Sequence, residues 1–255
     1  MAKNKLTKFA EMETFENVFQ CSAHEVNAEN PIVQMAGNWH EKYFHNTNPI
    51  VLELGCGRGE YTVGLAQRYP DKNFIGIDIK GARMWAGAKQ ATIANLKNAA
   101  FLRTNIELLP HFFAAGEIDE IWVTFCDPQM KKATKRLTSS FFLARYKQLL
   151  RENGIIHLKT DSPFLYQYTK EVLKCNDFTV LADTNDLYSE QVGEQWNEAR
   201  ALQTHYEHQW LERGMTIKYL SWELRHQDKY IEPDVEIEKD TYRSYGRNYV
   251  SSTNN

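Results

Sequence analysis

Short apolar runs alternate with amphipathic stretches along most of the chain. Runs of about four to eight apolar residues are typical of buried strands, and apolar residues about three or four positions apart indicate helices. This alternation of strand and helix predicts an α/β domain with a mostly parallel sheet. We predict strands at 51–54, 73–79, 100–104, 120–125 and 155–160, with helices at 82–96, 107–115 and 139–150 and from 163 onward.

The last part of the sheet is predicted to break this order. Phe178, Val180 and Ala182 alternate with polar residues, and residues 217–224 form another apolar run. These two strands bring the prediction to seven, with helices on both faces. In open sheets of this kind, ligands bind outside the carboxyl ends of the strands, where the strand order reverses. The polar side chains predicted near those ends are Glu53, Asp78, Asn105, Asp127 and Asp161.

The first predicted strand runs directly into three glycines at alternate positions, Gly55, Gly57 and Gly59. Glycine tolerates positive φ and lets a ligand approach the main chain closely. The three glycines alone fit a plain turn almost as well as a cofactor loop. Asp78 lies at the carboxyl end of the next predicted strand, 19 positions after Gly59, and this second feature favours a cofactor loop.

The residue after the loop helps to choose the cofactor. A dinucleotide-binding loop needs glycine where Glu60 stands. A carboxylate there would repel a pyrophosphate, which makes a nicotinamide-dependent dehydrogenase a remote alternative. Glu53 and Glu60 suit a cationic ligand such as S-adenosylmethionine. We predict that Glu53 and the glycines bind its methionine part, Asp78 its ribose hydroxyls and Asn105 its adenine.

Composition places limits on the remaining possibilities. The chain has 255 residues, of which 25% are charged and 42% hydrophobic, as expected for one globular α/β domain. It has no apolar run of about 18 residues and no apolar signal segment, so we expect a cytoplasmic protein without a membrane anchor. The four cysteines are far apart and form no CxxC pair, so we predict neither a metal site nor disulfides.

The net charge of −3 means that any nucleic-acid site must be local. One cluster, Lys131, Lys132, Lys135 and Arg136, directly follows Asp127 and Pro128 at a predicted strand end. Separately, a turn explains the Asp-Pro pair and a solvated surface explains the cations. Their adjacency at the ligand-binding edge instead favours a carboxylate that faces a nucleobase, next to cations that contact phosphates.

Together these features resemble the tRNA (guanine-N7)-methyltransferases of the TrmB type. The resemblance spans about residues 48–223 and implies a class I S-adenosylmethionine-dependent methyltransferase (Rossmann-like) fold. It also implies methyl transfer to N7 of guanine 46 in the variable loop of tRNA. Five motifs in order carry it: Leu52–Gly59, Gly76–Asp78, Asp127-Pro128 with Lys131, Thr160-Asp161, and the Thr-x-x-Glu box Thr204–Glu207.

The resemblance also implies residue roles. Asp127 corresponds to the catalytic acid and also contacts the cofactor. Three positions depart from the family pattern: Gln129 and Met130 replace a frequent tryptophan and histidine, and Asn105 replaces an aspartate. The implied substrate contacts are Lys131, Asp161, Thr204, His205, Tyr206 and Glu207, with phosphate contacts from Lys132, Lys135 and Arg136.

We divide the chain into three parts: an N-terminal extension (1–30) that is a candidate tRNA contact, a methyltransferase domain (31–225), and an acidic, tyrosine-rich C-terminal tail (226–255). We expect a monomer that binds tRNA and has no obligate protein partner. Two alternatives stay open. One is a methyltransferase of the same fold that acts on a small molecule, and the other is a non-catalytic RNA-binding adaptor.

Overall fold

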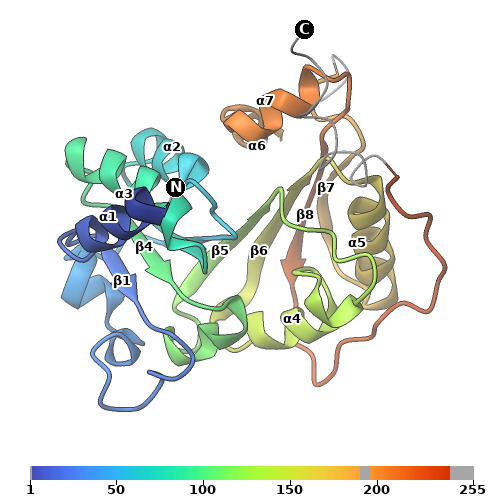
Figure 1. Cartoon of the computed structure of the whole chain (residues 1–255). Helices are drawn as coiled ribbons and strands as arrows, with labels where there is room; N and C mark the ends of the chain where they lie inside the picture. The colour runs from blue at the N-terminus through green and yellow to red at the C-terminus, as the bar shows by residue number, and fades with distance from the viewer. Residues whose placement is uncertain (1, 190–195, 242–255) are drawn as a thin grey trace, which may run out of the picture.

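The computed structural model describes residues 2–189 and 196–241, in which one eight-stranded sheet forms the centre (Figure 1). The strand order is β1-β4-β3-β2-β5-β6-β8-β7, and β8 is antiparallel to both of its neighbours. The predicted mostly parallel sheet is therefore confirmed. The strands are β1 (Val18–Gln20), β2 (Ile50–Leu54), β3 (Asn73–Asp78), β4 (Ala99–Arg103), β5 (Ile118–Thr124), β6 (Leu150–Thr160), β7 (Val180–Thr184) and β8 (Lys218–Leu224).

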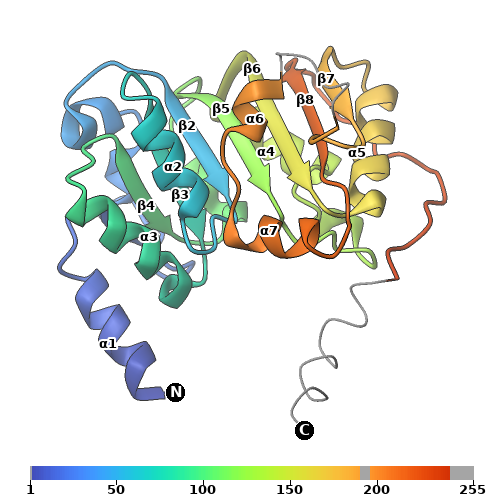
Figure 2. The same cartoon turned by 90° about the horizontal axis from the view of Figure 1, so that it is seen from above.

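Helices cover both faces of the sheet (Figures 1 and 2). On one face lie α1 (Ala2–Met12), α2 (Glu60–Arg68), α3 (Gly81–Ile93), α6 (Asn197–Arg200) and α7 (His205–Leu211). The other face is covered by α4 (Ser140–Tyr146), α5 (Pro163–Cys175) and the short helices η1 (Val33–Met35), η2 (His40–Phe44) and η3 (Ile106–His111). A further short helix, η4 (Ala133–Lys135), precedes α4.

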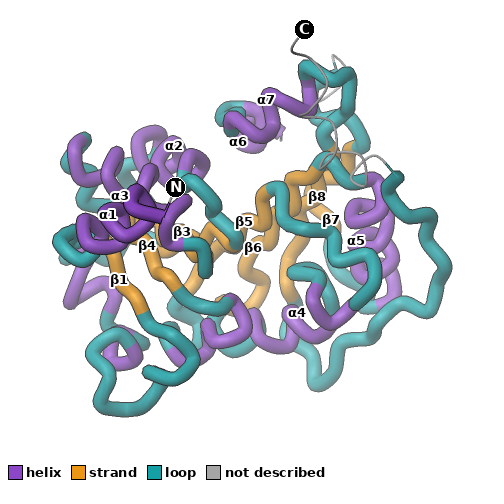
Figure 3. Tube along the Cα trace, in the orientation of Figure 1, coloured by secondary structure: helices purple, strands orange, loops and turns teal. Residues whose placement is uncertain are grey.

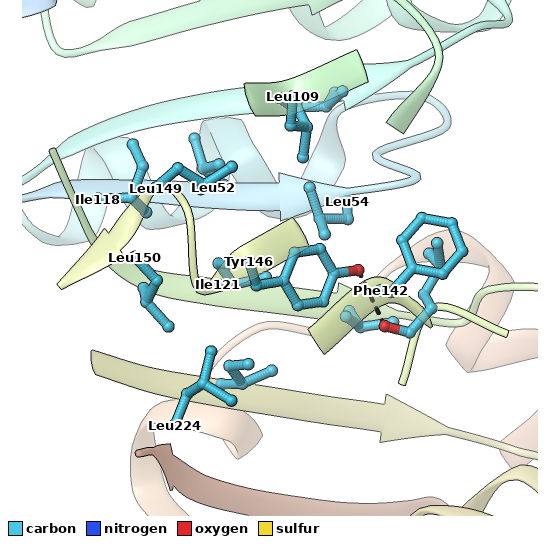
Figure 4. Close-up of a cluster of buried hydrophobic side chains, with 14 of the residues drawn as sticks. Leu52, Leu54, Leu109, Ile118, Ile121, Phe142, Tyr146, Leu149, Leu150 and Leu224 are labelled. Atoms are coloured by element: carbon cyan, nitrogen blue, oxygen red, sulfur yellow. Dashed lines mark hydrogen bonds between the residues drawn. The ribbon is translucent and has the colours of Figure 1, made fainter. Parts of the chain in front are cut away.

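The face under α4 has an apolar core (Figure 4). Leu52, Leu54 and Ile121 are fully buried there, and each such side chain contributes about 1.5–3 kcal/mol by leaving water. Tyr146 is also fully buried, and its hydroxyl donates to the carbonyl of Leu137 at 2.9 Å. This packing fixes the central strands, and therefore also the positions of the loops at their carboxyl ends.

The predicted count of seven strands is wrong, because residues of the N-terminal extension add an eighth. β1 pairs in parallel with β4, with Val18 opposite Phe101, and α1 packs on α3. Met12, at the end of α1, is fully buried. The sheet therefore begins well before residue 31. A strand of three residues is too short to show an alternating pattern, which is why the sequence did not reveal it.

The predicted helix at 139–150 is too long. α4 ends at Tyr146, and β6 begins at Leu150. Asn153, with φ of 56°, and Gly154 lie inside β6 instead of ending a helix. The pairing of β5 with β6 is irregular at this point, and such an irregularity tolerates a residue with positive φ.

The described part of the tail, residues 226–241, runs as a loop past α5 (Figure 3). Its acids bind helix N-termini. Glu232 accepts hydrogen bonds from the backbone N–H of Ser140 (3.2 Å) and from its hydroxyl (2.8 Å), at the start of α4. Asp240 accepts from the backbone N–H of Phe164 at 2.9 Å, at the start of α5. Carboxylates stabilise helices at these positions, so the acids have a structural role.

Candidate active site

The carboxyl ends of β2 and β5 lie side by side at the centre of the sheet. From β2, the chain order runs outward through β3 and β4 on one side and through β5 and β6 on the other. This reversal is the topological switch point, where open α/β sheets bind ligands. The structure brings together the glycine loop, Asp78, Asp127 and Asp161 at this edge.

Two of the loop glycines have different surroundings. Gly59 has φ of +71°, and a Cβ built there would lie 2.6 Å from Cε1 of Phe101 and 3.1 Å from Cα of Gly87. Gly59 therefore permits close packing of the loop against β4 and α3. Gly55 has φ of +77°, and a Cβ built there meets no atom within 4 Å. The space beside Gly55 allows a ligand to approach the main chain.

Asp78 links the two neighbouring loops through its carboxylate. Oδ2 accepts from the backbone N–H of Gly57 at 2.9 Å, and Oδ1 accepts from that of Lys80 at 2.7 Å. The next residue, Ile79, is 56% exposed. Ile79 is not among the predicted site residues, although its position as an apolar residue directly after the acid at a strand end was a signal for it. Its exposed side chain offers an apolar surface to a flat ring.

The end of the next strand adds two polar groups. The hydroxyl of Thr104 is buried without a hydrogen-bond partner among the described residues. Asn105 is partly exposed at the start of η3, and its side chain does not cap that helix. An unpartnered buried hydroxyl beside a partly exposed amide fits a polar ligand at this edge.

Glu53 lies below the loop, almost fully buried, with 4% exposure. Its carboxylate accepts from the backbone N–H of Thr62 (2.8 Å) and from the hydroxyls of Thr62 (2.5 Å) and Thr124 (2.7 Å). Burial raises its pKa to about 7, although these hydrogen bonds act in the opposite direction. The carboxylate thus fixes the start of α2. Contact of Glu53 with a cofactor stays a prediction.

Glu60 faces α7 in the structure. Its carboxylate accepts from the backbone N–H of His205 at 2.7 Å and lies 3.4 Å from Nε of Arg58. On sequence alone, Glu60 is a charge available to a cationic ligand. Its observed partners show that it anchors the start of α7 beside the glycine loop.

Asp127 is exposed in a strained turn after β5. Phe125 and Gln129, on either side of it, both have φ of 47°, a conformation that costs about 1–3 kcal/mol for a residue other than glycine. Asp127 Oδ1 accepts from the backbone N–H of Gln129 at 2.9 Å. Arg136 supports the turn by donating to the carbonyls of Gln129 (3.3 Å) and Met130 (3.2 Å). Strain of this kind is frequent at functional sites.

The four predicted phosphate-binding cations differ in their environments. Lys131 and Lys132 are exposed, and within the described residues their side chains make no hydrogen bond or ion pair. Lys135 pairs with Glu107 at 2.5 Å. The guanidinium of Arg136 lies over the ring of Tyr168, 4.3 Å from its centroid. Arg136 thus packs against the protein itself. Phosphate contacts of all four cations stay predictions.

The Thr-x-x-Glu box forms the start of α7. Thr204 accepts from the backbone N–H of Glu207 at 3.1 Å, and Glu207 accepts from that of Thr204 at 3.3 Å, which makes a capping box. Glu207 is fully buried, whereas Tyr206 is 40% exposed and its ring lies 5.8 Å from that of Phe125. The structure therefore places α7 beside the turn that carries Asp127. Direct substrate contacts of the box stay predictions.

A buried lysine on β6 holds this segment in place. Nζ of Lys159 lies 2.8 Å from the carboxylate of Glu207, and both side chains are fully buried. The same ammonium donates to the carbonyls of Ala199 (2.7 Å) and Leu202 (2.8 Å). Burial lowers the pKa of Lys159, although Glu207 acts in the opposite direction. Sequence reasoning gave Lys159 no specific role, because its partners lie far along the chain.

Asp161 ends β6 and is fully buried. Its carbonyl accepts from Nζ of Lys218 at 3.3 Å. Ser162 follows as the predicted N-cap of α5, with its hydroxyl accepting from the backbone N–H of Leu165 at 2.9 Å. The predicted cap is confirmed, and contact between Asp161 and substrate stays a prediction.

In the described residues there is no group of three or more His, Cys, Asp or Glu side chains that could hold a metal ion, and no helix long and apolar enough to span a membrane.

Comparison with solved structures identifies the fold of the chain. The chain is similar to an antibiotic-related methyltransferase (TM-score 0.54, 16% identical, covering 71% of this chain and 91% of that one). It is also similar to the 16S rRNA methyltransferase KamB (TM-score 0.55, 16% identical, covering 73% and 92%). The fold is that of the class I S-adenosylmethionine-dependent methyltransferases.

Sequence relatives define the family within this class. A family model described as "Putative methyltransferase" matches residues 47–220. The tRNA (guanine-N(7)-)-methyltransferase of Bacteroides fragilis is 55% identical over 97% of this chain and 96% of its own length. The enzyme of that name from Porphyromonas gingivalis is 58% identical over 92% and 96%. The chain belongs to the tRNA (guanine-N7)-methyltransferase family.

Proposed function

We propose that this protein transfers a methyl group from S-adenosylmethionine to N7 of guanine 46 in the variable loop of tRNA. The observation that carries the proposal is the exposed, strained turn of Asp127, which follows the strand next to the glycine loop. Exposed Lys131 and Lys132 follow this turn. Relatives that match nearly the whole chain bear the name of this activity.

The donor side fits the proposed cofactor. The open space at Gly55, the carboxylate of Asp78 and the exposed side chain of Ile79 suit a ligand with polar and flat aromatic parts. The glycine loop and Glu53 would hold its methionine part, Asp78 its ribose and Asn105 its adenine. When bound, S-adenosylmethionine supplies an electrophilic methyl group on a sulfonium.

The acceptor side has to orient the base and stabilise charge. N7 of guanine carries a free lone pair on its major-groove edge, so no proton has to be removed before attack. The purine gains positive charge as the new N–C bond forms. Asp127 stabilises that charge and aligns the base, with Asp161, which follows the neighbouring strand β6, as a second acid. Substrate contacts would come from Lys131, Thr204, His205, Tyr206 and Glu207, and phosphate contacts from Lys132, Lys135 and Arg136.

We further propose that the protein acts as a cytoplasmic monomer with tRNA as its partner and without an obligate protein partner. The target base has to leave its stacked neighbours to reach the edge of the sheet, which costs less in a tRNA loop than in a duplex. Support for tRNA as the partner comes from the position of Asp127 at the surface, where a base presented by a large RNA can reach it.

Incubation with labelled S-adenosylmethionine and unmodified tRNA tests the proposal, because aniline cleavage locates N7-methylguanine. We expect label in tRNA and one cleavage site, in the variable loop. Label at another atom would contradict the proposal. Label in a small molecule but not in tRNA would favour the small-molecule alternative. Binding of tRNA without any binding of S-adenosylmethionine in calorimetry would favour the adaptor.

A further inference from the structure

α1 extends beyond the body of the domain at the edge that carries the candidate site. It lies parallel to α3: Phe9 contacts Gly81, the first residue of α3, and Glu11 bonds to Trp85 and Lys89, further along α3. Residues 2–8 therefore project past the start of α3 by about 10 Å, given a rise of about 1.5 Å per residue. In Figure 2, α1 and α7 both lie on the side to which the arrowheads of β2 and β5 point.

Charge is separated along this N-terminal segment. The projecting part of α1 carries Lys5 and Lys8, whereas Glu11, Glu13 and Glu16 lie at or beyond its other end. Glu11 is neutralised by Lys89 at 2.7 Å. The projecting end is therefore cationic in a chain whose net charge is −3.

Aromatic rings hold two cations on and beside α1, and two more cations lie at the start of α3. Nζ of Lys8 lies 4.4 Å from the ring centroid of Trp85, and the guanidinium of Arg103 lies 4.6 Å from that of Phe9. These rings position the cations. Lys80 and Arg83, where α3 begins, are exposed. We call Lys5, Lys8, Lys80, Arg83 and Arg103 the α1 ridge.

We propose that the α1 ridge binds backbone phosphates of tRNA outside the loop that holds the target guanine. This inference rests on the proposed function, because it takes tRNA as the substrate. Lysine and arginine side chains gathered on one surface can contact the phosphates of an A-form helix, which proteins recognise largely through its backbone. The ridge lies at the same edge as Asp127 but on the opposite side of β2, so one RNA could contact both.

The test compares two triple variants that lose the same charge. The ridge variant is Lys5→Gln/Lys8→Gln/Arg83→Gln. The control variant is Arg68→Gln/Lys97→Gln/Lys174→Gln, whose three residues are exposed at the opposite edge, where α2, α3 and α5 end. The ligands are transcribed full-length tRNA and a short RNA that carries only the variable loop. Binding is measured without S-adenosylmethionine over a range of salt concentrations, and thermal melting checks that both variants fold.

We expect the ridge variant to bind full-length tRNA at least about tenfold more weakly than the control variant. Its salt dependence should fall by about 1 log unit per log unit of salt for each cation–phosphate interaction that the substitutions remove. Binding of the short RNA and kcat at saturating tRNA should match those of the control. If both variants bind tRNA equally, the inference is wrong. If wild type binds tRNA through the ridge but transfers no methyl group, the proposed function fails while the inference stands.

Discussion

The donor and acceptor sides of the site are built in different ways. The donor side consists of the glycine loop and Asp78, and its contacts come from neighbouring strands, such as the hydrogen bond that the N–H of Gly57 donates to Asp78. The acceptor side combines the Asp127 turn with α7, and Glu60 bonds to His205 across 145 positions. The donor side is thus built from strand ends close together in the chain, with Asp78 only 21 positions from Gly57, whereas the acceptor side needs segments far apart in the chain to pack together. Substitutions should therefore affect the two sides separately.

The largest effect is expected at the buried ion pair of the acceptor side. Lys159→Met leaves the Glu207 carboxylate buried without its cation, which should lower the free energy of unfolding by about 3–5 kcal/mol. Urea unfolding measures this. Lys135→Met, which breaks an ion pair with side chains 49% and 32% exposed, is the control and should cost less than about 1 kcal/mol. Similar losses in the two variants would refute the assigned role of Lys159.

The double variant Lys159→Met/Glu207→Gln sharpens this experiment. Neutralising the second partner removes the unpaired charge, so stability should partly return. The KM for tRNA should be raised in both the single and the double variant, because α7 has lost its attachment to β6. S-adenosylmethionine affinity should change little. A loss of cofactor affinity with an unchanged KM for tRNA would contradict the separation of the two sides.

The pH dependence of Glu53 tests the donor side. Its pKa of about 7 in the folded protein lies above the ordinary 4.5, so the folded state binds more protons between these values. The resulting stabilisation is complete below about pH 4.5 and is lost as the pH rises through 7. Relative to Glu53→Gln, wild type should therefore lose roughly 2–3 kcal/mol between pH 5 and pH 8. Parallel pH profiles of the two proteins in urea unfolding would exclude this effect.

The next largest loss of stability is expected from disturbing the close packing at the glycine loop. Gly59→Ala and Gly116→Ala both place a Cβ at positive φ, +71° and +72°, but only the first meets neighbouring atoms. Gly59→Ala should thus cost about 1–3 kcal/mol more than the Gly116 control. It should also weaken S-adenosylmethionine binding in calorimetry. Equal costs in thermal unfolding would show that the contact with Phe101 is relieved easily.

The smallest effect is expected for Asp127→Asn, because it removes a charge while keeping an acceptor for the N–H of Gln129. Single-turnover methylation should slow about 10- to 100-fold, or about 1.4–2.7 kcal/mol. The melting temperature should not change, since the side chain is exposed. The tRNA affinity should also stay unchanged, because contacts to phosphates supply most of it. Full turnover with unaltered binding would remove the electrostatic role of Asp127.

The difference between the donor and acceptor sides also explains which features could be predicted from the sequence. Apolar periodicity located the main strands, and with them the edge that gathers Asp78, Asp127 and Asp161. The partner of a long charged side chain cannot be identified from local pattern. The partners that the fold gives to Glu60, Lys135 and Arg136 were therefore not predicted from the sequence. The pattern also gave no sign of β1, because three residues carry too little periodicity.

One measurement tests the central claim that this edge aligns N7 of a tRNA guanine with a methyl donor. A tRNA in which only the variable-loop guanine is replaced by 7-deazaguanine keeps its shape and phosphates but has carbon in place of N7. We predict that wild-type protein binds this tRNA with unchanged affinity and transfers no methyl group to it. Methyl transfer at the rate seen with unmodified tRNA would contradict the account.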